Sequence, residues 1–176
     1  MSSTTTNKLY DYLKESEQKI FQGFEKLNTD DKLAWFYWIY EKMGDSITPA
    51  APSAADPNLA PVLLGTFYNL SDDEQLAIMR QIVNREDTEY SRYYGALAVN
   101  NRLMVWYGWA RAMGETVVDL PSDYSKTDAI DQLLNQAQQL EFQEQISVFR
   151  AIASDMGYSE VDSVPDQSQT GKTDSL

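Results

Sequence analysis

The chain has 176 residues, of which 43% are hydrophobic, and a formal net charge of −13. This length suits one domain with a real core, and the hydrophobic content excludes a chain that is disordered throughout. Histidine and cysteine are absent, which excludes disulfides, thiolate or imidazole metal sites, cysteine nucleophiles and histidine-based acid–base catalysis. The acidic balance, with Lys and Arg scattered singly, argues against a nucleic-acid partner.

Helices are expected along most of the chain, because apolar residues recur at helical spacing and no segment alternates convincingly with a period of two. The predicted helices cover 7–27, 30–43, 58–69, 72–84, 88–97, 99–113, 128–139 and 141–156. A Pro/Ala-rich loop is expected over 45–57 and a loop with apolar residues over 115–124. The pattern therefore predicts an all-α fold.

Several helix boundaries carry specific signals. Side chains that can accept hydrogen bonds from backbone amides predict the starts: Asn28 and Thr29, the capping box of Ser71 with Glu74, and Thr127. Glycines that can take a left-handed conformation predict the ends: Gly44, Gly114 and Gly157.

The same pattern predicts one domain with polar ends. Residues 1–6 are expected to be flexible, 7–157 to form the helical domain, and 158–176 to be a disordered polar tail. No apolar run is long enough to span a bilayer, and the N-terminus lacks the basic-then-apolar pattern of a signal peptide. A cytoplasmic location is therefore expected.

Two predicted helices are unusually aromatic. In 30–43, one stripe holds Leu33, Phe36, Tyr37 and Tyr40, and the opposite side holds Trp35, Trp38 and Ile39. In 99–113, one stripe holds Leu103, Trp106, Tyr107 and Ala110, and Gly108 lies inside the helix. A mid-helix glycine beside large aromatic residues indicates close approach of another backbone or a ligand.

Two interpretations of these helices stay open from the residues alone. Aromatic stripes at helical spacing are usually ordinary core. However, Trp and Tyr carry polar tips that a Leu/Ile core does not need, and few Leu/Ile-rich partner helices are present. A flat conjugated ligand, held between aromatic faces and lined by Met and Leu, fits this composition.

A family resemblance favours the ligand. The sequence resembles the N-terminal carotenoid-binding domain of the cyanobacterial orange carotenoid protein, in order and spacing, from about residue 27 to 158. The matching stretches are LAWFYWIYEKMGDSITPAAPSAADPN (33–58), MRQIVNREDTEYSRYY (79–94), NNRLMVWYGWARAMG (100–114), DLPSDY (119–124) and QISVFRAIASDMGY (145–158). Orange carotenoid proteins continue into a second, α/β domain, so the chain resembles the free-standing helical carotenoid proteins. The resemblance implies two interleaved four-helix bundles that hold one ketocarotenoid, such as canthaxanthin or echinenone.

The resemblance also implies site residues. The family's ring-stacking and essential positions fall on Tyr37, Tyr40 and Trp106. Other tunnel positions fall on Leu33, Phe36, Met79, Ile82, Leu103, Tyr107, Leu120 and Tyr124. The family often has Trp where this chain has Tyr37 and Leu97, so ring stacking at Tyr37 is expected to be weaker.

Two further positions concern partners. Arg150 matches the family's antenna-docking and inter-domain arginine, and Asn100 matches an inter-domain position. Without a second domain, both residues are expected to be unpaired.

The implied function is photoprotection by quenching singlet oxygen and other excited states. Without the second domain the family's light-driven switch is missing, so the quenching is expected to be constitutive. One alternative is a quencher that docks on the phycobilisome, although the charge of −13 argues mildly against an acidic antenna as partner. Another is a carrier that exchanges pigment with a separate partner resembling the C-terminal domain.

An enzyme is the weakest alternative. The acidic clusters at 72–74 and 86–89 lie where helix N-termini favour negative charge, which accounts for them without catalysis. The sequence also lacks a nucleophile elbow, a P-loop and a dinucleotide fingerprint.

Overall fold

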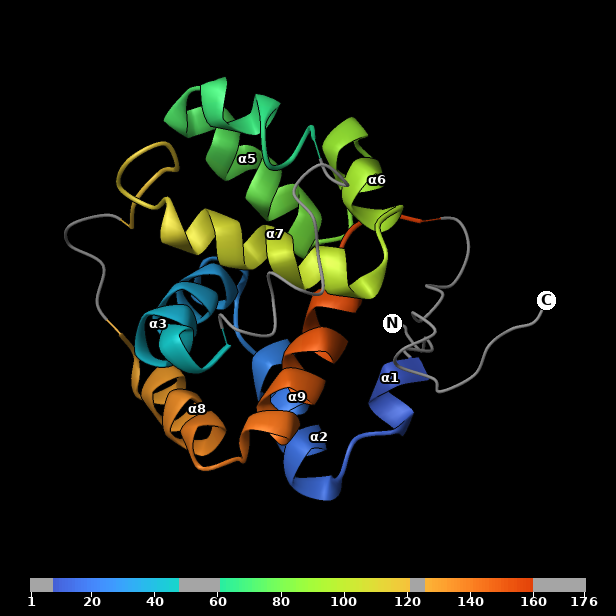
Figure 1. Cartoon of the computed structure of the whole chain (residues 1–176), viewed down its shortest axis with the longest axis vertical. Helices are drawn as coiled ribbons and strands as arrows, with labels where there is room; N and C mark the ends of the chain where they lie inside the picture. The colour runs from blue at the N-terminus through green and yellow to red at the C-terminus, as the bar shows by residue number, and fades with distance from the viewer. Residues whose placement is uncertain (1–7, 48–60, 121–125, 160–176) are drawn as a thin grey trace.

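The structure, a computed structural model, describes residues 8–47, 61–120 and 126–159. Its elements are α1 (Lys8–Asp11), α2 (Glu15–Glu25), α3 (Thr29–Ile47), the 3₁₀ helix η2 (Thr66–Asn69), α5 (Asp72–Val83), α6 (Glu89–Gly95), α7 (Val99–Arg111), α8 (Asp128–Gln138) and α9 (Phe142–Ser154) (Figure 1). The described ranges contain no β-strand, only an isolated bridge between Met113 and Val117. The all-α prediction is confirmed.

The eight α-helices of the described ranges form two interleaved groups of four. One group holds α1, α2, α8 and α9, and the other holds α3, α5, α6 and α7 (Figure 1). After the chain has built the second group, α8 and α9 return to pack on α2, while α7 packs on α9 and α3 contacts α8 and α9. This arrangement confirms the predicted pair of interleaved bundles.

Most predicted helix boundaries are confirmed by their capping contacts. Ser71 Oγ accepts from the Glu74 amide at 3.2 Å, and the Glu74 carboxylate accepts from the Ser71 amide at 3.0 Å. Asn28 Oδ1 accepts from the Asp31 amide at 2.8 Å, and Thr127 Oγ1 accepts from the Ile130 amide at 3.2 Å. The predicted ends at Gly114 and Gly157 are also confirmed, with φ of 85° and 79°.

The predicted helix over 7–27 is wrong, because the structure has α1 and α2 there. Lys14 is extended, with φ −70° and ψ 164°, and its amide donates to the Glu17 carboxylate at 2.9 Å. A second helix therefore starts where the apolar spacing alone suggested continuity.

The predicted end at Gly44 is wrong as well, since α3 continues to Ile47. A glycine ends a helix only where it takes positive φ, and among the described glycines only Gly114 and Gly157 do so. The predicted loop therefore begins after Ile47, and its remainder, 48–57, lies outside the described residues.

The predicted helix over 58–69 is a succession of turns in its described part. The Thr66 amide donates to the Pro61 carbonyl and the Phe67 amide to the Val62 carbonyl, so both bonds span five residues. Only Thr66–Asn69 then forms a short 3₁₀ helix. Residues 58–60 lie outside the described ranges.

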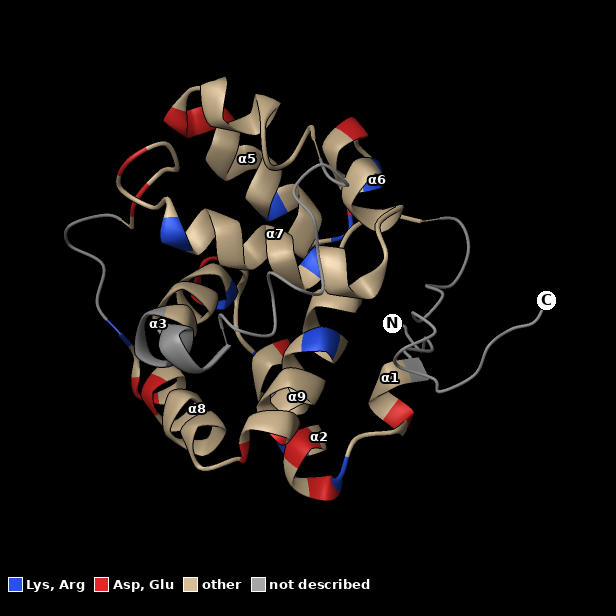
Figure 2. Ribbon diagram, viewed as in Figure 1, with Lys and Arg blue, Asp and Glu red and all other residues tan. Residues whose placement is uncertain are grey.

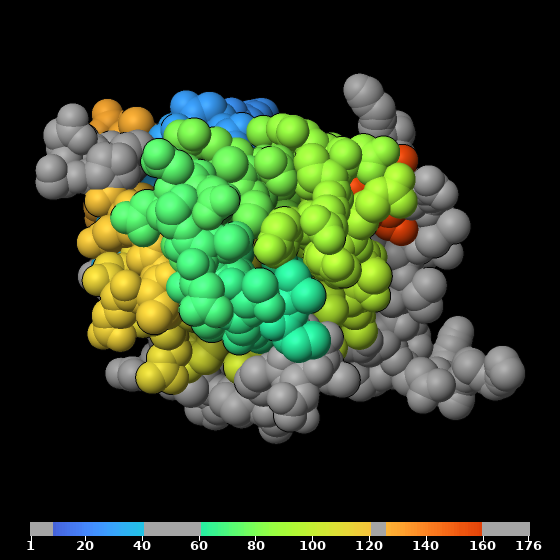
Figure 3. Space-filling model, turned by 90° about the horizontal axis from the view of Figure 1, so that it is seen from above, coloured from blue at the N-terminus to red at the C-terminus, as the bar shows by residue number. Residues whose placement is uncertain are grey.

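The C-terminal end of the described chain packs against α5 and α6. The Gly157 amide donates to the Ile82 carbonyl at 2.8 Å, and the Tyr158 amide donates to the Ser91 carbonyl at 3.0 Å. Seen from above, the last described residues lie beside α6 at the edge of the face formed by 61–70, α5 and α6 (Figure 3). Of the predicted flexible ends, residues 1–6 and residues 160–176 of the tail predicted over 158–176 lie outside the described residues, while Tyr158 at the start of that tail is held by the bond to Ser91.

The acidic residues and the lengths of the helices are two further features of the fold. Acidic residues gather in the first turns of α2, α5 and α8 (Figure 2), where the helix dipole stabilises negative charge. Within the described ranges, every helix is too short or too polar to cross a membrane.

Candidate functional site

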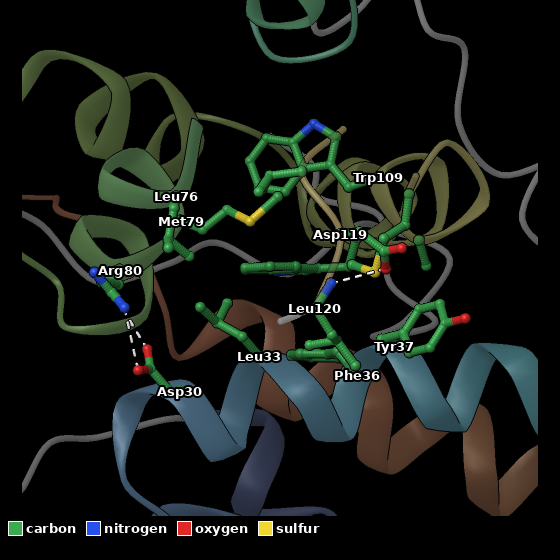
Figure 4. A pocket seen from close by; sticks show the side chains of 14 residues that line it. Asp30, Leu33, Phe36, Tyr37, Leu76, Met79, Arg80, Trp109, Asp119 and Leu120 are labelled. Atoms are coloured by element: carbon green, nitrogen blue, oxygen red, sulfur yellow. Dashed lines mark hydrogen bonds and ion pairs between the residues drawn. The ribbon is translucent and has the colours of Figure 1, made fainter. Parts of the chain in front are cut away.

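A cavity of about 200 Å³ lies between α3, α5, α7 and the segment that follows α7 (Figure 4). Its lining is mainly apolar and aromatic: Asp30, Leu33, Phe36, Tyr37, Leu76, Met79, Arg80, Trp106, Trp109, Ala110, Met113, Val118, Asp119 and Leu120. Helical spacing places these residues together. Positions three, four and seven residues apart share one face on α3, α5 and α7.

Parallel aromatic rings form one wall of the cavity. The rings of Phe36 and Trp106 lie 5.0 Å apart with an interplanar angle of 3°. Behind Phe36, the ring of Tyr40 lies 6.5 Å away at 21°. Trp109 meets Trp106 edge-on, with centroids 5.2 Å apart at 83°. The wall therefore offers flat apolar faces, which suit a planar conjugated ligand.

Hydrogen bonds hold both indoles of this wall in place. Trp106 Nε1 donates to the Tyr94 hydroxyl at 2.8 Å, and that hydroxyl donates to the Ala153 carbonyl on α9. Trp109 Nε1 donates to the Leu63 carbonyl at 2.9 Å. Burial raises the pKa of Tyr94, so the phenol keeps its proton at neutral pH. Both indole N–H groups are therefore satisfied, while one face of Trp106 stacks on Phe36 and one face of Trp109 stacks on Phe67.

A second aromatic layer lies behind the wall. The Tyr40 hydroxyl donates to the Leu103 carbonyl at 3.2 Å, and burial raises the pKa of Tyr40. The ring of Tyr107 lies 5.4 Å from that of Tyr40, and its hydroxyl accepts from Arg111 at 3.1 Å. Tyr40, Leu103 and Tyr107 therefore support the wall without lining the cavity.

The polar groups of the lining lie on two sides of it. Arg80 and Asp30 form an ion pair with two contacts of 3.0 and 3.1 Å. On the opposite side in Figure 4 lie Tyr37 and Asp119, whose carboxylate accepts from the Leu120 amide at 2.7 Å. The described lining therefore combines a mainly apolar surface with two carboxylates, one guanidinium and one phenol.

The structure brings most of the expected site residues together. Those that line the cavity are Leu33, Phe36, Tyr37, Met79, Trp106 and Leu120. Tyr40, Leu103 and Tyr107 form the second layer, while Ile82 is fully buried in the core outside the lining. Tyr124 lies outside the described residues. Their roles in ligand binding stay predictions.

Several lining residues were not predicted, although the helical spacing of apolar residues in the sequence could have identified them. Leu76 lies three residues before Met79, and Trp109 and Met113 lie three and seven residues after Trp106. The pairing of Asp30 with Arg80 had no such signal, because fifty residues separate them. What approaches Gly108 is the side chain of Leu64 rather than a backbone: a Cβ at Gly108 would lie 3.0 Å from a Leu64 methyl group.

The two expected partner-binding residues contact each other. Arg150 Nε on α9 donates to Asn100 Oδ1 on α7 at 2.7 Å, and both residues are half-buried. The expectation that they are unpaired is wrong, because the packing of α9 on α7 brings them together.

The acidic clusters lie outside the cavity. Glu74 is occupied by the cap of α5, and Asp87 is paired with Arg92, which holds the pKa of that carboxyl below its usual range. Within the described residues, no group of three or more Asp, Glu, His or Cys side chains could hold a metal ion.

Comparison with known proteins decides the family. A family model described as "Orange carotenoid protein, N-terminal" matches residues 11–159. A relative from Nostoc sp. (strain PCC 7120), named orange carotenoid-binding domain-containing protein, is 40% identical over 135 residues, which cover 76% of this chain and 79% of the relative. The chain belongs to this family.

Other relatives are longer than the chain. The orange carotenoid-binding protein of Synechocystis sp. is 33% identical over 137 residues, which cover 77% of this chain and 43% of that protein. The chain thus spans less than half of that relative.

Solved structures show the same fold. The red carotenoid protein of Anabaena (Nostoc) sp. PCC 7120, solved with bound canthaxanthin, is similar with a TM-score of 0.72 and 33% identity, covering 81% of this chain and 99% of that one. The orange carotenoid protein of the same organism, also solved with canthaxanthin, has a TM-score of 0.75 and 27% identity, covering 86% and 50%.

Proposed function

We propose that this chain binds one ketocarotenoid in the cavity between α3, α5 and α7, and that the pigment dissipates excited-state energy, chiefly that of singlet oxygen, as heat. The observation that carries the proposal is the apolar cavity with the parallel rings of Phe36 and Trp106 on its wall. Two structures of the same fold, from Anabaena, bind canthaxanthin. A pigment that accepts and dissipates energy needs a surface that holds it, which the mainly apolar lining supplies.

Apolar burial supplies the affinity. Each 100 Å² of polyene removed from water contributes about 2.5 kcal/mol, so a long pigment offsets the cost of association without any charged contact. The cavity of about 200 Å³ is smaller than the roughly 300–1,000 Å³ of common ligand pockets. We therefore expect Phe36 to rotate when the pigment enters, so that the second layer of Tyr40 and Tyr107 contacts it as well.

The quenching is proposed to be constitutive. The described cavity lining comes from several helices of the helical unit, which supports a site that holds pigment without a second unit. The red carotenoid protein of Anabaena, matched over 99% of its length, corresponds to this helical unit and binds canthaxanthin. Antenna docking, pigment exchange with a separate partner and a cytosolic location stay predictions.

Expression in a host that makes canthaxanthin tests the proposal. We expect a coloured protein with one pigment per chain that quenches singlet oxygen faster than an unrelated soluble protein of equal concentration. Trp106→Ala and Tyr40→Ala should lose the pigment or shift its absorption maximum. A folded, colourless wild-type protein would refute carotenoid binding, and a coloured protein without quenching would refute the photoprotective role.

A further inference from the structure

One charged side chain stands out in the apolar lining of the cavity. Arg80, in the last turn of α5, donates through Nε and Nη2 to the two carboxylate oxygens of Asp30, in the first turn of α3, at 3.0 and 3.1 Å. The ion pair joins two helices that form walls of the cavity (Figure 4). Two parallel contacts fix the planar guanidinium in one orientation.

The other hydrogen-bond donors of the lining are largely occupied. Trp106 Nε1 donates to Tyr94, and Trp109 Nε1 donates to Leu63. The Leu120 amide donates to its neighbour Asp119. A guanidinium carries five N–H groups, and Asp30 takes two of those of Arg80.

Arg80 is also the one cation among the described lining residues. Tyr37, whose hydroxyl is another polar group of the lining, lies on the opposite side of the cavity in Figure 4. A ligand oxygen on the α5 side therefore meets one strong, pre-oriented donor.

We propose that Arg80, held by Asp30, donates a hydrogen bond to the terminal ring carbonyl of a carotenoid in the cavity and so selects ketocarotenoids over hydrocarbon carotenoids. The inference rests on the proposed function and adds the residue that sets its ligand preference. A ring ketone accepts a hydrogen bond from the guanidinium, whereas β-carotene offers no acceptor and leaves the remaining N–H groups without one. Because the Arg80 side chain is 46% exposed, water can partly replace the carbonyl, and the preference is moderate.

Competition between two pigments tests the inference. Purified apoprotein is offered equal amounts of canthaxanthin and β-carotene, and the bound pigments are extracted and quantified by chromatography. We expect wild-type protein to favour canthaxanthin and Arg80→Met to reduce the ratio about tenfold, as for loss of one hydrogen bond to a charged group.

Arg92→Met is the matched control. Arg92 is paired with Asp87 outside the lining, and the side chains of that pair are 49% and 54% exposed, against 46% and 52% for Arg80 and Asp30. This variant loses one cation and one surface ion pair, as Arg80→Met does, and should keep the wild-type pigment ratio.

The carbonyl stretching frequency of bound canthaxanthin gives a second readout that a merely structural role would not move. It should be lower in the wild-type protein, where the carbonyl accepts a hydrogen bond, than in Arg80→Met. An unchanged pigment ratio and carbonyl frequency in Arg80→Met would overturn the inference and leave carotenoid binding intact. Uptake of neither pigment by wild-type protein would instead overturn the proposed function.

Discussion

Helix α3 contributes aromatic residues to two regions that differ in how their rings meet. On the side of α2 and α9, Trp35 is fully buried and meets Phe24 and Phe149 edge-on, with centroids 5.4 and 5.9 Å apart. On the side of α5 and α7, Phe36 and Trp106 lie parallel and border a cavity. We call the first region the core side and the second the cavity side.

The difference shows that aromatic composition alone does not mark a ligand site. Edge-to-face rings interlock and fill space, as a close-packed core requires. On the cavity side Phe36 and Trp106 stack on each other, Trp109 meets Trp106 edge-on, and the apolar space beside these rings is the proposed ligand site. One helix therefore supplies both a core and a candidate binding wall, because its apolar residues cover nearly its whole circumference.

The largest effect is expected for Trp35→Ala on the core side. Removing a fully buried indole should lower the free energy of unfolding by about 3–5 kcal/mol, and urea denaturation of the apoprotein measures this. The residual folded protein should still bind one pigment per chain, because Trp35 does not line the cavity. Loss of pigment without loss of stability would contradict the division into two sides.

A smaller effect is expected for Tyr94→Phe, which removes a link between the two sides. The Tyr94 hydroxyl accepts from Trp106 and donates to Ala153. Its loss leaves a buried indole N–H and a carbonyl without partners, which should cost about 1–3 kcal/mol of stability. In contrast to Trp35→Ala, this variant should also shift the visible absorption of bound pigment, since Trp106 is no longer fixed. An unshifted spectrum would mean that the hydrogen bond does not orient the wall.

Asp155→Asn should change how stability depends on pH. Burial, then the nearby Glu25 carboxylate, raises the pKa of Asp155 from 3.8 to about 7, although Arg85 lies 3.1 Å away. The folded state therefore binds this proton more tightly than the unfolded chain. The resulting stabilisation is fully present below pH 3.8 and is lost as pH rises through 7.

Urea denaturation between pH 5 and 8 isolates this effect, because the chain has no histidine to titrate there. Wild-type stability should fall by about 2–3 kcal/mol across the range, and the stability of Asp155→Asn should stay nearly constant. Equal pH profiles would show that the Asp155 carboxyl is ionised throughout. Pigment binding should be unaffected, because Asp155 does not line the cavity.

The smallest effect is expected for Gly108→Ala behind the cavity side. Alanine gains about 1 kcal/mol of helix propensity over glycine. Part of this gain is lost because the new methyl group would lie 3.0 Å from Leu64, whose side chain must shift slightly. A stabilisation of less than about 1 kcal/mol is expected in thermal unfolding. A destabilised variant would show that Leu64 cannot move and that glycine is required for close packing.

Parts of this molecule could be predicted from the sequence because local chemistry determines them. The start of α5 follows from Ser71 and Glu74, and the face of α3 toward the cavity follows from the spacing of Leu33, Phe36 and Tyr37. The break at Lys14 was missed because apolar spacing continues across it.

Other features depend on tertiary packing, which one sequence does not reveal. Three features join residues on different helices. They are the parallel stacking of Phe36 on Trp106, the link from Trp106 through Tyr94 to α9, and the Asp30–Arg80 ion pair. The helical spacing of the aromatic residues predicted the candidate wall of the cavity but not the hydrogen bonds and ion pair of its polar groups.

The central claim is that the carotenoid binds in the cavity between α3, α5 and α7. The most direct test is a substitution that fills this cavity with a larger side chain. Ala110 lines the cavity on α7, and Ala129 is exposed on α8. We would express Ala110→Trp and Ala129→Trp with canthaxanthin and measure pigment per folded chain. The account predicts one pigment per chain for Ala129→Trp and for wild-type protein, and a nearly colourless but folded Ala110→Trp. A folded Ala110→Trp that carries one pigment per chain would show that the carotenoid binds elsewhere.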